Sequence, residues 1–573
     1  MFRTMRAGSR RSSVPPLLLF LLLAFAASNA APTAWTRGVV ASDHEIASRA
    51  GLEMLEKGGN AVDAAVATAF ALSVVRPYAS GIGGGGFLVV YLADGEGGRS
   101  IAIDYRERAP RAVGPNFYEG LEDTLACRFG GRSVGVPGAV AGLLHALERY
   151  GTLDRATVLA PAIRAAEEGF LADRHYVLSA REMIPVLESL PLLRERSPFT
   201  WSRFLGEGKI AEGNRILLPE QADALRLIAE RGTHAFYGGP IGEAVVQAAE
   251  ASGGVLAGED LESFAVKERT PLEGEFRGKR ILGMPPPSSG GIALLQILGI
   301  FDRLTGGEEP PARNSPAYVH LLVEAMKHAF ADRAEWPGDP AFVEVPVERL
   351  LSGGYLDERA ASVQRARALG PDAYGTKAPP PDDRGTSHFG AVDRFGNAAA
   401  GTESINYSFG SLVAVPEYGF VLNNTMDDFL TRRGTANLFG LLQSERNLPA
   451  PGKIPLSSMS PTIVLDDEGV LAVAGGSGGP RIISGTAEVL LGVVLFDQDA
   501  EEAVAAPRFH HQWMPNKLLL EPGFGREIQM ALFGMGHSLE RTDAVAAVPL
   551  IRRSAAGYQA SSDPRKGGAP AGY

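Results

Sequence analysis

The sequence predicts an α+β protein in which helices and strands stack in layers. Helical and strand periods of apolar residues interleave along nearly the whole chain. The chain has 573 residues, well beyond the roughly 250–300 residues at which a single core stops growing. Its composition, 45% hydrophobic and 21% charged, is typical of a globular protein. A small single-core domain and a disordered or fibrous chain are therefore both excluded.

The charge and the cysteine count narrow the function classes further. A formal net charge of −11 argues against nucleic acid as a main partner, because phosphate binding needs clustered Lys and Arg. Cys127 is the only cysteine, so an internal disulfide and a Cys-x-x-Cys redox or zinc motif are impossible. We interpret Cys127 as a structural thiol. His510 and His511 are adjacent and lack a nearby ligand set, so we predict no metal and no cofactor.

The first thirty residues are interpreted as a signal peptide. Four arginines precede an unbroken apolar run over residues 17–27, and residues 28–30 are suited to signal peptidase. The run is well short of the roughly twenty residues that a membrane-spanning helix needs. A retained membrane anchor is the alternative. We expect an exported protein, periplasmic or extracellular, with no stable membrane span.

The mature chain begins with a helical pattern. Apolar residues recur with helical spacing over residues 44–76, with a break at residues 58–60. A glycine cluster at residues 81–86 leads into a strand at residues 87–92, which are rich in β-branched and aromatic side chains. The middle third, about residues 140–370, is mostly helical, with rigid turn chemistry at residues 285–291. No repeat of solenoid period is present.

The sharpest boundary lies at residues 371–385. This stretch is polar and rich in proline, and we expect it not to be packed. Exposed linkers of this kind are where chains are cut. Strand patterns begin immediately after it.

A hairpin is predicted directly after this linker. Residues 393–397 have the composition of a turn, and the segments on both sides are typical of strands. Folding the hairpin about Phe395 puts Thr386 opposite Ser404, with Cβ atoms about 4.5–5.5 Å apart. Side chains alternate along a strand, so Asn406 should share the face of Ser404, whereas Glu403 should turn away.

Thr386 in this position is a candidate nucleophile. Its hydroxyl becomes reactive only when a base removes the proton, and a free α-amino group of pKa about 7.7–8.0 is suited to that task. Cleavage between Gly385 and Thr386 would create this amine, and the glycine eases close approach of the hydroxyl to the preceding carbonyl. Taken alone the pattern is weak, because threonine is common on strand faces.

Further segments resemble the γ-glutamyltransferases, also called γ-glutamyl transpeptidases or glutathione hydrolases. The hairpin resembles the start of their small subunit. Other similar segments follow in order along nearly the whole mature chain: residues 58–65, 83–87, 104–110, 285–291, 423–429, 455–462, 475–480 and 562–573. The resemblance implies a four-layer αββα sandwich of the N-terminal nucleophile hydrolase type.

The resemblance also implies self-cleavage into two subunits. The large subunit would span residues 31–385 and the small one residues 386–573, with the two remaining associated in one αββα unit. Thr386 corresponds to the nucleophile. Gly478 and Gly479 correspond to the glycines whose N–H groups form the oxyanion hole, where loss of one donor costs about 10²–10³ in rate. Ser404 keeps the hydroxyl of a position where threonine is more usual.

The expected substrate-binding residues follow from the same resemblance. Arg106 would pair with the substrate α-carboxylate, which a guanidinium can bind through two hydrogen bonds. Ser457 and Ser458 would add hydroxyl donors to that carboxylate. Asp428 would hold the α-ammonium group, with Asn406 nearby.

Thr425 departs from the family pattern. Most members carry Gln or Glu at this substrate-binding position. Threonine is shorter and uncharged, so we expect the ammonium to depend more heavily on Asp428, and the acyl-group preference is open. Residues 430–454 are long enough to form the lid loop of some members.

The implied activity is cleavage of the γ-glutamyl amide of glutathione or a related compound through a Thr386 acyl-enzyme. The acyl group would pass to water, or to an amino acid or dipeptide. The alternative is an acylase of the same superfamily, acting on glutaryl or cephalosporin side chains, or a hydrolase or transferase of poly-γ-glutamate. A non-enzymatic binding protein is a third reading, but Thr386, Asp428 and the glycine pair that it should have lost are all present.

Overall fold

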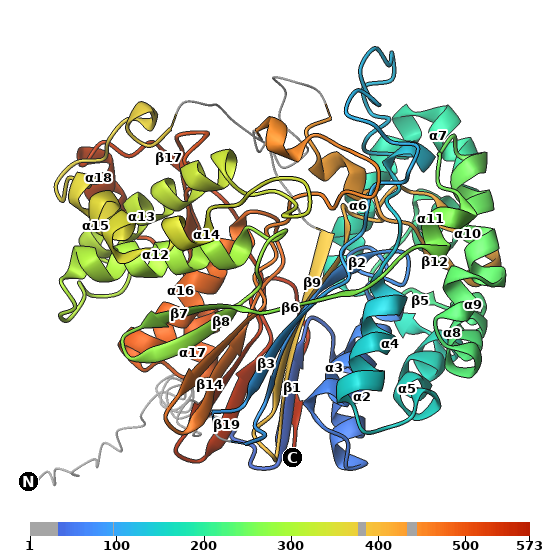
Figure 1. Ribbon diagram of the computed structural model, residues 1–573, viewed down its shortest axis with the longest axis horizontal. Helices are drawn as coiled ribbons and strands as arrows, with labels where there is room; N and C mark the ends of the chain where they lie inside the picture. Colours follow the sequence, from blue (N-terminus) through green and yellow to red (C-terminus); the bar gives the residue numbers. More distant parts are fainter. Residues whose placement is uncertain (1–32, 96, 376–384, 432–443) are drawn as a thin grey trace, which may run out of the picture. The chain divides into compact units, whose positions relative to one another are not determined.

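Two antiparallel β-sheets lie face to face in the computed structural model, and helices cover the outer side of each (Figure 1). The structure describes residues 33–95, 97–375, 385–431 and 444–573. Residues Ala34–Tyr573 form one compact unit. The predicted signal peptide, residues 376–384 of the predicted linker and residues 432–443 of the predicted lid loop lie outside the described residues.

The first sheet has the predicted hairpin at its centre. β9 (Gly385–Asp393) pairs with β10 (Ala398–Asn406), and β1 flanks β9 while β2 flanks β10. The full order is β20 (Ala571–Gly572), β1 (Gly38–Ser42), β9, β10, β2 (Gly85–Leu92), β3 (Arg99–Asp104) and β6 (Lys267–Arg269).

The second sheet combines strands from both ends of the chain. Its centre is a hairpin of β13 and β14, and the hairpin of β7 and β8 continues the sheet beside β13. The full order is β19 (Gly557–Ser561), β18 (Leu550–Ser554), β14 (Gly469–Ala474), β13 (Thr462–Asp466), β8 (Lys279–Gly283) and β7 (Leu272–Phe276).

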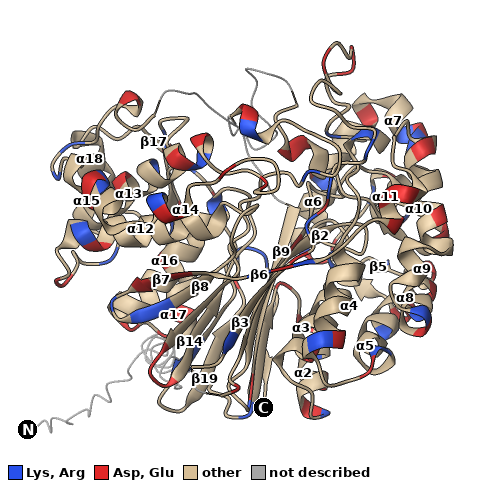
Figure 2. Cartoon of the chain, in the orientation of Figure 1, with Lys and Arg blue, Asp and Glu red and all other residues tan. Residues whose placement is uncertain are grey.

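Helices form the two outer layers, where Figure 2 shows acidic and basic residues interspersed while the strands carry few of them. Against the first sheet and its inner helices pack α2 (Glu45–Glu56), α3 (Ala61–Val75), α4 (Ala139–Tyr150), α5 (Arg155–Glu168), α6 (Arg174–Ser189), α8 (Pro219–Arg231) and α10 (Pro240–Ala251). Against the second pack α12 (Gly290–Thr305), α13 (Pro316–Glu335), α15 (Gly353–Ser362), α16 (Arg481–Phe496) and α17 (Ala500–Ala505).

Three buried clusters hold these layers together. One fills the space between the two sheets and includes Val39, Phe87, Ile463 and Val473. The other two lie between each sheet and its helices. Because a sheet that is apolar on both faces must be covered on both faces, this arrangement confirms the predicted α+β class and the four-layer αββα sandwich.

The early elements agree with the sequence pattern. α2 and α3 are separated at the predicted break, where Gly58 has φ +88° and Asn60 caps α3. The Asn60 side chain accepts hydrogen bonds from the N–H groups of Val62 and Asp63, and the Asp63 carboxylate accepts one from the Asn60 N–H. Every residue of α3 is buried, as expected for a helix that is apolar on all sides.

The middle third is mostly helical, as predicted, and it also contains the short strands β4 (Phe170–Leu171), β5 (Arg215–Ile216), β6, β7 and β8. One sequence expectation needs correction. The start of the predicted linker is packed: Tyr374 is buried, and the Pro371 carbonyl accepts a hydrogen bond from the Trp513 indole at 2.8 Å. Tyr374 is a large aromatic side chain in an otherwise polar stretch, and its burial anchors residues 371–375.

None of the helices in the described residues has the length and apolar character needed to cross a membrane.

Candidate active site

A polar pocket lies beside the first residues of β9. Most of the predicted site residues line it, together with Arg333, which the sequence did not single out. The lining residues are Arg106, Arg333, Thr386, Ser404, Asn406, Asp428, Leu456, Ser457, Ser458, Met459, Gly479, Pro480 and Ile482.

Thr386 and Ser404 face each other across the hairpin. The predicted pairing is confirmed: Thr386 is directly opposite Ser404 in the register of β9 and β10. Their hydroxyl oxygens are 3.2 Å apart. The Ser404 hydroxyl donates a hydrogen bond of 2.5 Å to the carbonyl oxygen of Gly385, the residue before Thr386 in the uncut chain. With its proton engaged there, Ser404 Oγ can accept a hydrogen bond from the Thr386 hydroxyl.

Asn406 reaches the pocket through a backbone irregularity. The register of the hairpin shifts between Ser404 and Asn406, and Asn406 has φ +78°. Regular alternation, on which the sequence prediction rested, is therefore interrupted by a β-bulge. The Asn406 N–H donates to Ser404 Oγ at 2.8 Å, and its side-chain amide donates to the Asn424 carbonyl at 3.0 Å. The bulge thus ties Asn406 to the hydroxyl pair.

Glu403 is buried outside the pocket lining. Its carboxylate accepts a hydrogen bond from the Tyr105 hydroxyl at 3.1 Å. Burial raises the pKa of Glu403 to about 8.

Gly478 and Gly479 form a tight turn before α16. Both have positive φ, +128° and +54°, which favours glycine at these two positions. Within the described part of the chain, neither N–H donates a hydrogen bond to a protein acceptor. Gly479 lines the pocket, whereas Gly478 is not among its lining residues. Two adjacent N–H donors free of protein acceptors are what an oxyanion site requires.

Arg106 and Asp428 form a buried ion pair at the pocket. Arg106 also contacts the Glu107 carboxylate, with its Nη1 3.1 Å from Oε2, so that one guanidinium is shared by two carboxylates. Burial raises the pKa of Asp428 to about 7, even though Arg106 acts in the opposite direction. This carboxyl therefore titrates near neutral pH.

Ser457 and Ser458 lie on a loop held by the turn at residues 285–291. The Ser457 carbonyl accepts hydrogen bonds from the N–H and the hydroxyl of Ser289, at 2.8 and 2.6 Å. The Ser458 hydroxyl accepts a hydrogen bond from Arg333 Nη2 at 2.8 Å. Arg333 belongs to α13, and no motif at that point of the sequence marked it as a site residue.

Thr425 does not line the pocket. It is fully buried, its N–H donates to the Asn423 side chain at 3.1 Å, and its methyl group packs against Gly135. The short side chain is enclosed by this packing.

Lys566 is a second residue that the sequence analysis missed. Its ammonium group contacts the carbonyl oxygen of Thr386 and lies 2.8 Å from the Asp43 carboxylate. It lies in the C-terminal segment, residues 562–573, that carries part of the family resemblance, but nothing in that segment indicated contact with Thr386.

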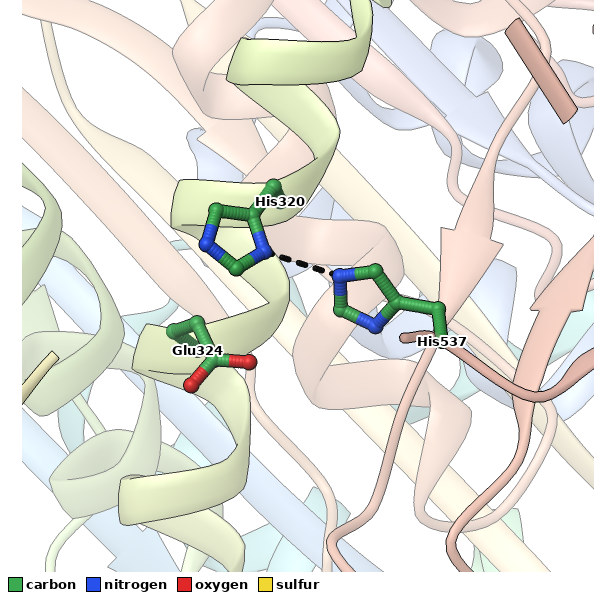
Figure 3. A group of neighbouring side chains, drawn as sticks. All are labelled: His320, Glu324 and His537. Carbon is green, nitrogen blue, oxygen red and sulfur yellow. Dashed lines mark hydrogen bonds between the residues drawn. The ribbon is translucent and has the colours of Figure 1, made fainter. Parts of the chain in front are cut away.

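Outside this pocket, one group in the described residues has the ligand types of a metal site. His320, Glu324 and His537 are buried, with one ligand atom of each within 4.8 Å of the others (Figure 3). The two imidazoles hydrogen-bond to each other at 2.8 Å. Glu324 forms an ion pair with Lys327 and accepts a hydrogen bond from the Tyr374 hydroxyl. The second ring nitrogen of His320 is 2.8 Å from the Gln364 carbonyl oxygen, so the histidines and Glu324 have protein partners in this buried polar cluster.

Comparison with known proteins agrees with this geometry. A family model described as gamma-glutamyltranspeptidase matches residues 47–573. The chain is 38% identical to the glutathione hydrolase proenzyme of Pseudomonas sp. strain A14, over 86% of this chain and 85% of that protein. It is also 36% identical to the acylase ACY 1 proenzyme of Pseudomonas sp. strain SE83, over 90% of this chain and 89% of that protein.

Solved structures show the same likeness. The crystal structure of cephalosporin acylase from Bacillus halodurans superimposes with a TM-score of 0.83 at 28% identity, covering 95% of this chain and 97% of that one. Sequence and fold thus agree over nearly the whole described chain. The chain belongs to the gamma-glutamyltranspeptidase family and is an enzyme of the N-terminal nucleophile hydrolase type.

Proposed function

We propose that this enzyme cuts its own chain before Thr386 and then transfers γ-glutamyl groups from glutathione and related compounds. The acceptor is water in hydrolysis, and an amino acid or dipeptide in transfer. The observation that carries the proposal is the arrangement of Gly385, Thr386 and Ser404 at the edge of a pocket that also holds Arg106 and Asp428.

The self-cleavage step follows from the contacts of Ser404. Its hydroxyl polarises the Gly385 carbonyl, which makes the carbonyl carbon more electrophilic. Thr386 Oγ adds to that carbon, the bond to the Thr386 nitrogen breaks, and the nitrogen takes up a proton to become an amine. Water then hydrolyses the resulting ester. The products are a large subunit ending at Gly385 and a small subunit beginning at Thr386.

The transfer step uses the amine that self-cleavage releases. This α-amino group, with a pKa near 8, takes the Thr386 hydroxyl proton while Oγ attacks the γ-carbonyl of the donor. The negative charge on the carbonyl oxygen is met by the N–H groups of Gly478 and Gly479. The leaving amine takes the proton, and an acyl-enzyme ester remains. Water or an acceptor amine attacks this ester and restores Thr386.

The pocket has charges for a free amino-acid head group. Asp428 offers a carboxylate to the α-ammonium, with the Asn406 amide alongside. Arg106, Ser457 and Ser458 offer donors to the α-carboxylate. Since the Thr425 side chain is enclosed elsewhere, the ammonium depends on Asp428. A γ-glutamyl group carries both charges, whereas a glutaryl group lacks the ammonium.

A glutaryl or cephalosporin acylase is the second candidate, and poly-γ-glutamate is a related substrate. The absence of Thr425 from the pocket lining favours it, because the ammonium then loses a partner. The similarity to an acylase proenzyme and to the Bacillus halodurans acylase points the same way. The paired Arg106 and Asp428 support the γ-glutamyl donor more strongly, because Asp428 has no charged partner on a glutaryl group.

Two accompanying features belong to the same proposal. The leader-like residues 1–30 support export to the periplasm or the outside of the cell, with the mature chain beginning near residue 31. The shared sheets support a large and a small subunit that remain associated after the cut.

Gel electrophoresis and N-terminal sequencing of the purified protein test the self-cleavage. We expect two bands, with a small subunit that begins Thr-Ser-His-Phe, and a single band for Thr386→Ala. Turnover of γ-glutamyl and glutaryl 4-nitroanilides then separates the two candidates. A higher kcat/KM on the glutaryl compound would overturn the γ-glutamyl assignment.

A further inference from the structure

Arg333 is a buried cation in the wall of the pocket. Only 4% of its surface is exposed, yet it lines the same pocket as Thr386. Its Nη2 donates to Ser458 Oγ at 2.8 Å, and its Nε has no hydrogen-bond partner in the described part of the chain. α13 delivers this side chain from the second sheet's helix layer, opposite the hairpin that carries the nucleophile.

Arg333 and Arg106 differ in their partners. Arg106 contacts the carboxylates of Glu107 and Asp428. Among the residues that the structure describes, no carboxylate lies within ion-pair distance of Arg333, and Asp428 acts on it only at longer range. The Arg106 guanidinium is therefore paired with two carboxylates, whereas the Arg333 guanidinium donates to one neutral hydroxyl, that of Ser458.

A buried guanidinium without a counter-charge is costly, since desolvation of an ion is offset only by pairing. Burial lowers the pKa of Arg333 to about 10, which still leaves it charged at neutral pH. Among the described residues, the Glu107 and Asp428 carboxylates both pair with Arg106, so Arg333 has no carboxylate within ion-pair distance. The carboxylate of a zwitterionic head group can pair with Arg333 while its ammonium pairs with Asp428.

We propose that Arg333 is a second carboxylate-binding residue of the acyl-donor site and determines its specificity for donors with a free α-carboxylate. The inference rests on the proposed γ-glutamyl function. The donor carboxylate lies between Arg106 and Arg333, and Ser458 is oriented by Arg333 so that it meets the same group. Arg333 supplies the positive charge that Arg106 already shares between two carboxylates.

A substrate pair tests this directly. The donors are L-glutamic acid γ-(4-nitroanilide) and its α-carboxamide analogue, which lacks only the carboxylate charge. We expect Arg333→Gln to lower kcat/KM about 10- to 100-fold on the carboxylate donor, because charged hydrogen bonds of this kind are strong. On the carboxamide we expect a change under about 3-fold. A purely structural role would lower both to the same extent and would overturn the inference.

Controls keep a failure of folding apart from a loss of recognition. Arg303→Gln removes a partly exposed arginine that pairs with Asp357 and should leave turnover of both donors unaffected. If Arg333→Gln does not self-cleave, Arg333→Lys replaces it, and the same preferential loss on the carboxylate donor is expected because an ammonium lacks the planar fork. A wild-type protein inactive on both donors would instead contradict the proposed function itself.

Discussion

Ser404 Oγ lies 3.2 Å from Thr386 Oγ and 2.5 Å from the carbonyl oxygen of Gly385. One hydroxyl therefore touches both the attacking group and the carbonyl of the proposed self-cleavage. This relationship makes Ser404 the first residue to test in self-cleavage.

Ser404→Ala should slow the appearance of the small subunit by about 100-fold, because the scissile carbonyl loses its donor. Ser404→Thr keeps the hydroxyl and should cleave at a rate close to wild type. Timed gel electrophoresis of freshly purified precursor measures both. Cleavage of the alanine variant at the wild-type rate would remove Ser404 from the mechanism.

Protonation of Asp428 should make kcat/KM fall on the acidic side of the pH profile. Its pKa is raised to about 7 by burial, and the carboxyl must be ionised to hold a substrate ammonium. We therefore expect kcat/KM to rise as pH increases through about 7 and to fall below it, since kcat/KM reports groups of the free enzyme. Asp428→Asn should lower kcat/KM about 100-fold and remove the contribution near pH 7, leaving the limb that the Thr386 α-amino group, with a pKa near 8, gives as general base.

The matched control for Asp428 is Asp223→Asn, which changes an exposed carboxylate beside Arg226. Its pH profile should superimpose on that of the wild type. A limb near pH 7 that persisted in Asp428→Asn would assign the titration to another group.

Lys566 should act on the rate more than on binding. Its ammonium group contacts the Thr386 carbonyl and pairs with Asp43, so it holds the backbone of the proposed nucleophile in place. Lys566→Met should lower kcat by about 10- to 100-fold with little change in KM, because small misplacements of a reacting group are costly. Steady-state kinetics on the γ-glutamyl anilide measure the split, and a rise in KM alone would contradict this role.

Glu324 and Lys327 should matter for stability. Their side chains are fully buried and form an ion pair. Glu324→Gln leaves the Lys327 ammonium without its counter-charge and should destabilise the fold by about 3–5 kcal/mol. The double variant Glu324→Leu with Lys327→Met removes both charges and should recover much of that loss. Denaturation midpoints measure the stability of the single and the double variant. Equal midpoints for these two variants would show that the charges of Glu324 and Lys327 are not coupled.

The sequence predicted the parts of the site that depend on local patterns. The hairpin register follows from a turn of clear composition and a strand period of two, so the pairing of Thr386 with Ser404 could be predicted from the sequence. The bulge at Asn406 was not, because it depends on backbone contacts with Ser404 and Asn424. The family resemblance identified Arg106 and Asp428, but not that they pair with each other.

Arg333 shows why the rest could not be predicted. It lies in a helix whose residues are buried on most sides, so its periodicity carries no sign of a pocket. Its proposed role depends on Ser458, which it contacts, and on Thr386, which lines the same pocket; both are distant from it in the sequence. The burial of Tyr374 was easier to predict than the position of Arg333, because a large aromatic side chain in a polar stretch indicates that the chain is anchored there.

The position of β9 and β10 has a consequence for the two polypeptides that a cut would produce. Both strands are inserted between β1 and β2 of the preceding part of the chain, and in the second sheet β8 from that part pairs with β13. Each product would lack the neighbours that complete its sheets. A single nick would therefore leave an interlocked heterodimer, and neither half alone would have a closed core to fold around.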